Sequence, residues 1–510
     1  MSYDSLVEDL RQRNEKARQG GSARAKEKHV AQNKFLVRDR LERFFDDGQY
    51  TEDGLLAGMS RDMPGDAVIT CVGKVDGREV AVIANDMTVK AGTWGYTTFR
   101  KIVRMQEMAV ANKLPIVYFM DSAGARIDEQ RECYLGRVAW GNIFHTQVQI
   151  SGIVPQICLM FGPSPAGSAY VPALSDVTFM VDKNATAYLG SPRLAEMAIG
   201  EKVTEEQMGG ARMHCVASGL GDLLAQTELE VMEKGKKYLR FFPGAWDLPV
   251  PLVDARPPAE SRRIEDIVPH DQNRPYEVHE LINAIVDQDS FLEIKALFAK
   301  EMVTGLAHLG GRPVGIVANN SMVKGGVLFN DSADKGARFI WLCNAYGIPL
   351  LFLQDISGYM IGSAVEKAGI IRHGAKLLTA VCEAKVPRIS LMVRKGYGGG
   401  YLAMSGAPTQ PDAQLALPSA KPALMGPEAA INAIYYNEIH RLQGDERTAF
   451  IKEKQAEYAK DIDVYEPADK FSFEAVVEPS LLRDDLIRRF AIYSRREIPM
   501  FKRRNGVYPG

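Results

Sequence analysis

The chain contains an internal repeat. The segment "GREVAVIANDMTVKAGTWG" begins at Gly77 and is similar to "GRPVGIVANNSMVKGGVLF", which begins at Gly311. At the offset that joins these two residues, the alignment continues without a gap until Asp121 meets Asp355. A repeat of this length is a complete folding unit, so the sequence predicts two domains built on one plan.

Each copy has the same predicted order of elements. A strand, a glycine-containing loop and a helix precede a strongly apolar strand and a glycine turn, after which come a helical segment and a further apolar strand. These elements are strands 80–83 and 314–317, helices 98–112 and 332–344, and the apolar strands "PIVYFM", "PLLFLQ", "VPQICLMF" and "VPRISLMV". Continuous apolar strands that alternate with helices indicate a sheet buried on both faces, which predicts the α/β class.

The length of the chain also favours two domains. Its 510 residues are about twice what one hydrophobic core usually serves. Segment 241–263, "FFPGAWDLPVPLVDARPPAESRR", is rich in proline and charge and has no periodicity, as is typical of a connection between domains. We predict an N-terminal domain over residues 1–245 and a C-terminal domain over 246–510.

Four glycine-rich turns follow predicted strands, two in each domain. They are 123–125 (AGA) and 166–168 (AGS) in the first domain, and 357–359 (SGY) and 398–400 (GGG) in the second. Small residues let a ligand approach backbone N–H groups, and a following helix adds partial positive charge. Two such turns aimed at one point would bind an oxyanion, such as the enolate oxygen of a thioester.

Other chemistries find little support in the sequence. A single glycine turn is usually only a turn, but four in duplicated register favour a functional role. "GYGGGYLAMSG" is neither a P-loop nor a dinucleotide fingerprint, and no GxSxG or HExxH is present. Ser122 has no base beside it, Asp121 is expected to stabilise its turn, and His214 and His373 are expected to be packed and hydrogen-bonded. A site without a side-chain base suits a substrate that carries its own.

Composition narrows the class of protein further. A formal net charge of -2 argues against nucleic acid or an anionic membrane as the main partner. The six cysteines form no CxxC pair, so neither a zinc ribbon nor a disulfide framework is expected. The N-terminus shows no signal or transit pattern, and no apolar run is long enough to cross a bilayer. We expect a cytoplasmic protein.

Several long motifs resemble one family, the carboxyltransferase (β) subunits of biotin-dependent acyl-CoA carboxylases, such as propionyl-CoA and methylcrotonyl-CoA carboxylase. The resemblance covers nearly the whole chain. Its motifs are "DSAGARIDE", "GPSPAGSAYVPALSDVTFMV" and "TEEQMGGARMH" in the first half, and "DISGYMIG", "AGIIRHGAKLL" and "GYGGGY" in the second. It implies two homologous crotonase/ClpP-like spiral domains and an active site at a dimer interface.

The resemblance assigns one substrate to each pair of turns. The first pair would hold the thioester carbonyl of an acyl-CoA, and the second the ureido oxygen of carboxybiotin. Biotin would then serve as the base for the α-proton, and no metal is implied. The implied residues are Ala123, Gly124, Gly167 and Ser168 for the thioester, Arg126, Ala166 and Ala364 as further substrate contacts, and Gly358, Tyr359, Gly398, Gly399 and Gly400 for biotin.

Some positions depart from the family pattern. Ala123 replaces the first glycine of the usual "SGGAR", and "GPSPAGSA" replaces "GPCAGGA". A backbone amide survives both changes, so both turns can still donate. Ala364 is compatible with a larger acyl group and equally with simple helix packing.

The sequence leaves the direction of transfer and the partners open. "SAVEKAG" leans towards the carboxyltransferase subunits of biotin-dependent decarboxylases, which run the reaction in reverse. More distant alternatives are a crotonase-like hydratase, isomerase or thioesterase that uses Asp121 or Glu129, and a non-catalytic acyl-CoA-binding or assembly scaffold. Without an ATP-grasp loop or an "MKM" motif, biotin carboxylase and the biotin carrier must be other chains. A homo-oligomer of at least a dimer, and a hexamer by analogy, is implied.

Overall fold

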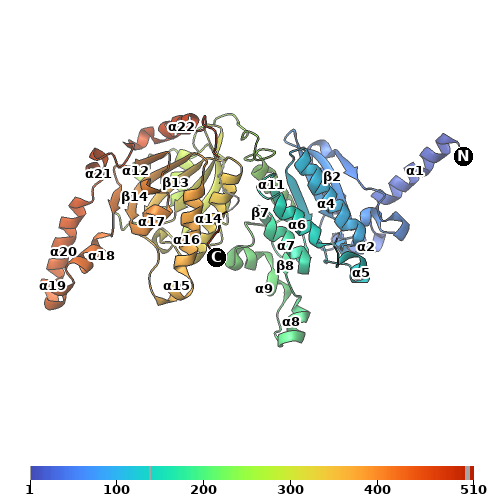
Figure 1. Cartoon of the computed structure of the whole chain (residues 1–510), viewed down its shortest axis with the longest axis horizontal. Helices are drawn as coiled ribbons and strands as arrows, with labels where there is room; N and C mark the ends of the chain where they lie inside the picture. The colour runs from blue at the N-terminus through green and yellow to red at the C-terminus, as the bar shows by residue number, and fades with distance from the viewer. Residues whose placement is uncertain (1, 137–138, 500–505, 510) are drawn as a thin grey trace. The chain divides into compact units, whose positions relative to one another are not determined.

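A computed structural model describes residues 2–136, 139–499 and 506–509. The chain divides into two compact units, Met1–Pro249 and Val250–Gly510, so the division falls inside the proline-rich segment (Figure 1). Each unit is described by itself below.

Unit 1 is built on a mixed seven-stranded sheet with the order β1-β2-β3-β4-β5-β7-β9. β1, β2 and β3 are antiparallel, and the sheet is parallel from β3 onwards. The strands are β1 (Tyr50–Asp53), β2 (Val68–Val75), β3 (Arg78–Asn85), β4 (Ile116–Met120), β5 (Gln156–Met160), β7 (Val177–Val181) and β9 (Leu223–Ala225), with β6 (Pro163–Pro165) and β8 (Thr186–Tyr188) paired separately.

Helices such as α4, α7 and α11 pack on this sheet, whereas α1, α8 and α9 project away from it (Figure 1). The α-helices of unit 1 are α1 (Tyr3–Arg18), α2 (Ala23–Val30), α3 (Val37–Phe44), α4 (Tyr96–Ala111), α5 (Gln130–Cys133), α6 (Gly141–Gln149), α7 (Tyr170–Leu174), α8 (Pro192–Ile199), α9 (Glu205–Gly209), α10 (Ala211–Met213) and α11 (Glu228–Leu239).

Unit 2 has an eight-stranded sheet with the order β10-β11-β12-β13-β14-β15-β17, and β16 pairs with β14. The strands are β10 (Leu292–Ile294), β11 (Met302–Leu309), β12 (Arg312–Asn319), β13 (Leu350–Ile356), β14 (Arg388–Tyr397), β15 (Ala413–Ala416), β16 (Lys421–Ala423) and β17 (Ala475–Val476). Its α-helices are α12 (Ile264–Ile267), α13 (Val278–Ile285), α14 (Asn330–Ala345), α15 (Ser363–Lys367), α16 (Ile370–Glu383), α17 (Gly398–Ala403), α18 (Pro427–Ile434), α19 (Tyr436–Arg441), α20 (Gly444–Asp461), α21 (Tyr465–Asp469) and α22 (Leu482–Tyr493).

The duplication is preserved down to strand register. The β2–β3 hairpin pairs Val68 with Asn85, and the β11–β12 hairpin pairs Met302 with Asn319, the residues at the offset found in the sequence. Every residue of β4 and of β13 is buried, as predicted for a sheet covered on both faces. The predicted helices 98–112 and 332–344 correspond to α4 and α14, which each begin two residues earlier.

Both long helices carry a lysine at the same repeat position, half-buried in the case of Lys101 and buried in the case of Lys335. Nζ of Lys101 donates to the carbonyl of Gly65 at 2.8 Å, and Nζ of Lys335 donates to the carbonyls of Lys295 and Phe298, both at 2.9 Å. Burial lowers the pKa of each ammonium to about 8. The two lysines close the loop that precedes each β-hairpin, so the repeat conserves a polar core contact as well as an apolar pattern.

In the described part of the chain, no helix combines the length and the apolar character needed to cross a membrane. All six cysteines are free thiols, and only Cys382 is exposed.

Candidate active site

The first glycine turn of each unit follows a central strand and is held in the same way. In unit 1, Trp94 N–H donates to the carbonyl of Gly124, and Arg126 N–H donates to that of Trp94, both at 2.9 Å. In unit 2, Leu328 N–H donates to the carbonyl of Gly358 at 3.1 Å. Gly124 and Gly358 have φ of +94° and +131°, which favour glycine. Two repeats therefore place an equivalent turn at equivalent strand ends.

The second turn of each unit lies directly against the first. A Cβ added to Gly400 would be 2.9 Å from Cα and 3.3 Å from N of Gly358, so these two backbones are in contact. In unit 1, a Cβ on Gly124 would be 3.4 Å from the carbonyl oxygen of Pro165, the residue before Ala166. The structure thus brings each predicted pair of turns together. We call the pair in unit 1 the first cradle, and the pair in unit 2 the second cradle.

The second cradle presents backbone donors. Gly398, Gly399 and Gly400 are the first three residues of α17, where N–H groups have no partner within the helix. Within the described residues, the amides of Gly358 and Tyr359 form no hydrogen bond to protein. Gly398 has φ +53°, so the sharp entry into α17 also depends on glycine.

The first cradle distributes its donors differently. Ala123 N–H donates to the carbonyl of Ala91 at 2.9 Å, and Gly124 N–H donates to Oγ of Ser122 at 3.0 Å. The predicted donors of this turn are therefore engaged within the protein. Ala166 and Gly167 open the short helical turn Ala166–Ala169, where N–H groups lack an intrahelical partner.

A hydrogen bond of Ser168 and the backbone angle of Ala166 define the conformation of the 166–168 turn in unit 1. Ser168 is buried, and its hydroxyl donates to the carbonyl of Pro165 at 2.6 Å. Ala166 has φ +53°, a left-handed conformation that costs a residue with a Cβ more than glycine. Ala166 therefore holds a conformation that a Cβ disfavours, and the Ser168 hydroxyl helps to fix the turn.

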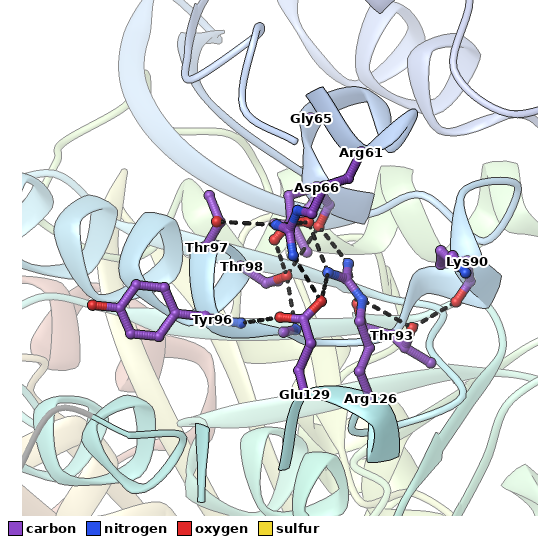
Figure 2. A network of polar contacts seen from close by, with 12 residues as sticks. Arg61, Gly65, Asp66, Lys90, Thr93, Tyr96, Thr97, Thr98, Arg126 and Glu129 are labelled. Carbon is purple, nitrogen blue, oxygen red and sulfur yellow. Dashed lines mark hydrogen bonds and ion pairs between the residues drawn. The ribbon is translucent and has the colours of Figure 1, made fainter. Parts of the chain in front are cut away.

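Arg126 uses all its donors within unit 1 (Figure 2). Its Nη1 donates to Asp66 at 2.7 Å and to Glu129 at 3.1 Å, its Nη2 to the carbonyls of Asp66 and Thr93, and its Nε to the Thr93 hydroxyl. A guanidinium has five N–H groups, so none is left for a phosphate or carboxylate of a substrate. Arg126 ties the loop before β2 to the first turn.

The carboxylates considered for a single-cradle hydratase are both engaged. Glu129 accepts from the N–H of Tyr96, the first residue of α4, at 2.8 Å, and from Arg61 at 2.9 Å (Figure 2). Asp121 is fully buried and pairs with Lys34 at 2.8 Å and Arg40 at 3.0 Å. Burial alone would raise the pKa of Asp121, but the two cations hold it below its ordinary value. Neither carboxylate is placed to take a proton from a substrate.

An apolar cavity of about 420 Å³ adjoins the second cradle. Gly399 and the ring of Tyr359 form part of its wall. Burial raises the pKa of the Tyr359 phenol, which therefore stays protonated. The other lining residues include Met360, Ile370, Ile371, Leu378, Leu402 and Ala403. Ala364 lies exposed on α15 and is not among them.

The sequence reasoning missed the cavity residues that follow "GYGGGY". Leu402 and Ala403 come one turn after the glycines in α17, so their position in the motif could have pointed to them. It was right about the histidines. His214 is hydrogen-bonded to Ser218 and to the carbonyl of Ala187, both at 2.7 Å, and His373 is paired with Asp334 at 2.8 Å.

Each of the two α/β units brings a pair of glycine turns into contact, and such turns present main-chain N–H groups of the kind that can stabilise an oxyanion. The family model described as "Carboxyl transferase domain" matches residues 28–508. The chain belongs to the carboxyl transferase family and is an enzyme of the carboxyltransferase type, similar to the β subunits of acyl-CoA carboxylases.

Relatives agree in length as well as in sequence. A Bacillus subtilis protein described as the uncharacterized carboxylase YngE is 51% identical over 98% of both chains. The biotin-dependent 3-methylcrotonyl-coenzyme A carboxylase beta1 subunit of Mycobacterium tuberculosis is 38% identical over 93% of this chain and 91% of its own. The methylmalonyl-CoA decarboxylase subunit alpha of Propionigenium modestum is 34% identical over 99% of this chain and 98% of its own.

A solved structure shows the same fold. Transcarboxylase 12S, determined as a hexamer with methylmalonyl-coenzyme A bound, superposes with a TM-score of 0.93 over 100% of this chain and 99% of its own, at 34% identity. The predicted fold, two crotonase-like α/β domains, is confirmed by this match together with the duplicated strand register.

Proposed function

We propose that this chain moves a carboxyl group between biotin, carried on another chain, and the α or vinylogous γ carbon of an acyl-CoA. The observation that carries the proposal is the contact between the two glycine turns of a unit, most directly that of Gly400 with Gly358. It concentrates main-chain donors at one point, which suits an oxygen that becomes negative during reaction. Acyl-CoA carboxylation is the proposed direction.

The first cradle is proposed to hold the thioester oxygen of the acyl-CoA. The amides of Ala166 and Gly167 are the proposed donors, because those of Ala123 and Gly124 are engaged within the protein. The 123–125 turn then supports the cradle. Arg126 fixes that turn and does not contact the substrate.

The second cradle is proposed to hold the ureido oxygen of biotin. Gly358, Tyr359, Gly399 and Gly400 supply amides, and the glycine at position 398 permits the entry into α17. The adjoining cavity has the apolar character and the size that suit a small bicyclic ring or an acyl chain. Carboxybiotin supplies CO2 and, once it has lost it, a basic ureido nitrogen.

The proposed contribution of the chain itself is to stabilise the negative charge that develops on the substrate oxygens. As the α-proton leaves the acyl-CoA, negative charge gathers on the thioester oxygen, which the first cradle stabilises until the carbon attacks CO2. Each such donor typically contributes roughly 100- to 1000-fold in rate. Asp121 and Glu129, the carboxylates near the first cradle, are held in ion pairs, and we propose that the proton acceptor arrives with the substrates.

Decarboxylation of an acyl-CoA is the second candidate. The relative from Propionigenium modestum, named as a methylmalonyl-CoA decarboxylase subunit, supports it. One cradle pair stabilises the same enolate in both directions, so the partners decide the net direction. Copurification with a biotin carboxylase supports carboxylation, and copurification with a membrane protein supports the decarboxylase.

The proposed partners also include a second copy of this chain. Helices α8 and α18 project from their units and expose apolar side chains: Met197 is 85% and Ile199 74% exposed on α8, and Ile434 is 61% exposed on α18 (Figure 1). Apolar surface of this kind is usually covered in an oligomer. The transcarboxylase relative is described as a hexamer, and we propose a homo-oligomer here too. The free cysteines support a cytoplasmic location.

One assay tests the proposal. The purified chain is incubated with malonyl-CoA or methylmalonyl-CoA and free biotin, and loss of the carboxyl group is followed. Turnover that depends on biotin is expected. Binding of acyl-CoA without turnover of any carboxylated acyl-CoA, even with a biotinylated partner present, would favour the scaffold alternative. A panel of short, branched and long acyl-CoAs then defines the substrate.

A further inference from the structure

A buried carboxylate stands behind each cradle at the same repeat position. Asp121 follows β4 and Asp355 lies near the end of β13, and both side chains are fully buried. An unpaired charge in such a place is costly, and a negative one would also oppose an anion forming at the adjacent cradle. Both carboxylates are paired, but by unrelated means.

In unit 1 the cations come from the N-terminal arm, residues 22–45. Lys34, between α2 and α3, donates to Oδ1 of Asp121 at 2.8 Å, and Arg40 of α3 donates to Oδ2 at 3.0 Å. Arg40 also donates twice to Glu228 of α11, at 2.7 and 2.8 Å, and stacks over the ring of Phe161. The arm is therefore anchored directly beneath the first cradle.

In unit 2 the cation comes from the sheet itself. Arg394 of β14 donates to Oδ2 of Asp355 at 2.6 and 3.1 Å. The N–H of Lys395 donates to Oδ1 at 3.2 Å. The strands β5 and β14 are equivalent, since Gln156 and Arg388 pair with the equivalent residues Ile116 and Leu350. Gly162 therefore occupies the position of Arg394 in unit 1, so the sequence repeat does not account for this cation. Both units therefore neutralise the buried aspartate behind the cradle, but the cations come from different segments of the chain.

Each ion pair lies between the two turns of its cradle. A Cβ on Gly162, which leads into the second turn of unit 1, would be 1.9 Å from Oδ1 of Asp121 and 2.5 Å from Nζ of Lys34. In unit 2, Arg394 and Lys395 belong to the strand that ends in the second turn, while Asp355 precedes the first. Each pair therefore ties one turn to the other.

We propose that Lys34, Arg40 and Arg394 are positioning residues for carboxyl transfer, which hold the turns of each cradle together and cancel the negative charge behind their amides. This inference rests on the proposed function. It also gives the N-terminal arm a role in the reaction, through Lys34 and Arg40.

The test compares charge variants in the biotin-dependent decarboxylation of malonyl-CoA or methylmalonyl-CoA. We expect Lys34→Met and Arg394→Met to lower kcat by roughly 10- to 100-fold, somewhat less than the loss of a direct donor. Lys34→Arg should retain most of the rate. Lys113→Met, which removes the exposed ion pair with Asp247, is the matched control and should leave kcat unchanged.

The double variant Lys34→Met/Asp121→Asn separates charge from simple stability. It removes cation and carboxylate together, so it can fold even where Lys34→Met does not, and its kcat should recover to within a few-fold of wild type. A folded double variant that is as slow as or slower than the single one overturns the inference, as does a folded Lys34→Met with wild-type kcat. Absence of turnover in the wild-type chain would instead count against the proposed function.

Discussion

Replacing Gly400 by alanine is the sharpest test of the second cradle. The added Cβ would lie 2.5 Å from Cγ1 of Ile356 and 2.9 Å from Cα of Gly358, and atoms do not approach so closely without moving. One contact is to backbone, which cannot simply rotate away. The methyl group must therefore push the two turns of the cradle apart.

The expected effect is larger on catalysis than on folding. Overpacking a tight site typically costs about 1–3 kcal/mol of stability. Displacing an oxyanion donor typically costs about 2.7–4 kcal/mol in the transition state, or roughly 100- to 1000-fold in kcat. Because the donors act on charge that develops during reaction, KM for the acyl-CoA should change little.

The assay measures kcat and KM for biotin-dependent decarboxylation, together with thermal unfolding of each variant. Gly141→Ala is the control, because a Cβ at Gly141, the first residue of α6, meets no atom within 4 Å. A folded Gly400→Ala enzyme with kcat within about threefold of wild type would show that the contact of these turns is not needed for the reaction.

Three further predictions follow from particular contacts. Gly358→Pro removes one amide donor and forces φ from +131° to about −65°, so transfer should be lost while unit 1 stays folded; a normal rate in the folded variant would remove this turn from the mechanism. Arg126→Met should lower kcat but leave the affinity for CoA unchanged in calorimetry, because all five donors are used within unit 1; a large loss of CoA affinity would instead make Arg126 a substrate contact. The hydrogen bond to Glu293, opposed by burial and supported by one to Glu277, raises the pKa of His279 to about 9. The charged His279 and its two glutamate partners should stabilise the fold fully below about pH 6.5. This stabilisation should be lost as pH rises through about 9, where His279 loses its proton. Denaturant unfolding of wild type and His279→Gln between these pH values measures the difference, and a difference that grows with pH would contradict the assignment.

Much of the fold was predictable because it is written in local patterns. The duplicated segments predicted equivalent strands over 80–83 and 314–317, which are parts of β3 and β12, and apolar runs marked β4 and β13 as buried strands. The helices α4 and α14 begin two residues before the predicted starts, because Thr98 and Ser332 each cap their helix by accepting from the amide three residues earlier.

The sequence was less informative about what each site residue contacts. It placed Arg126 beside the substrate, whereas the structure shows its five N–H groups used inside unit 1 (Figure 2). It named Ala123 and Gly124 as donors, but their amides already have protein acceptors. The acceptor of the Ala123 N–H, the carbonyl of Ala91, is remote in sequence. The Ser122 hydroxyl that accepts from Gly124 is itself held by the distant carbonyl of Gly92, so a motif alone cannot decide which amides are free.

By itself the sequence determined the duplication, the α/β class, the family and the four glycine turns, because each is encoded in periodicity or in residues close together along the chain. Only the tertiary structure decided which turns touch, which amides remain available, and that Lys34 and Arg40 of the N-terminal arm neutralise Asp121. The physical reason is that an ion pair spanning more than 80 residues leaves no local pattern, and its stability depends on the burial that folding creates.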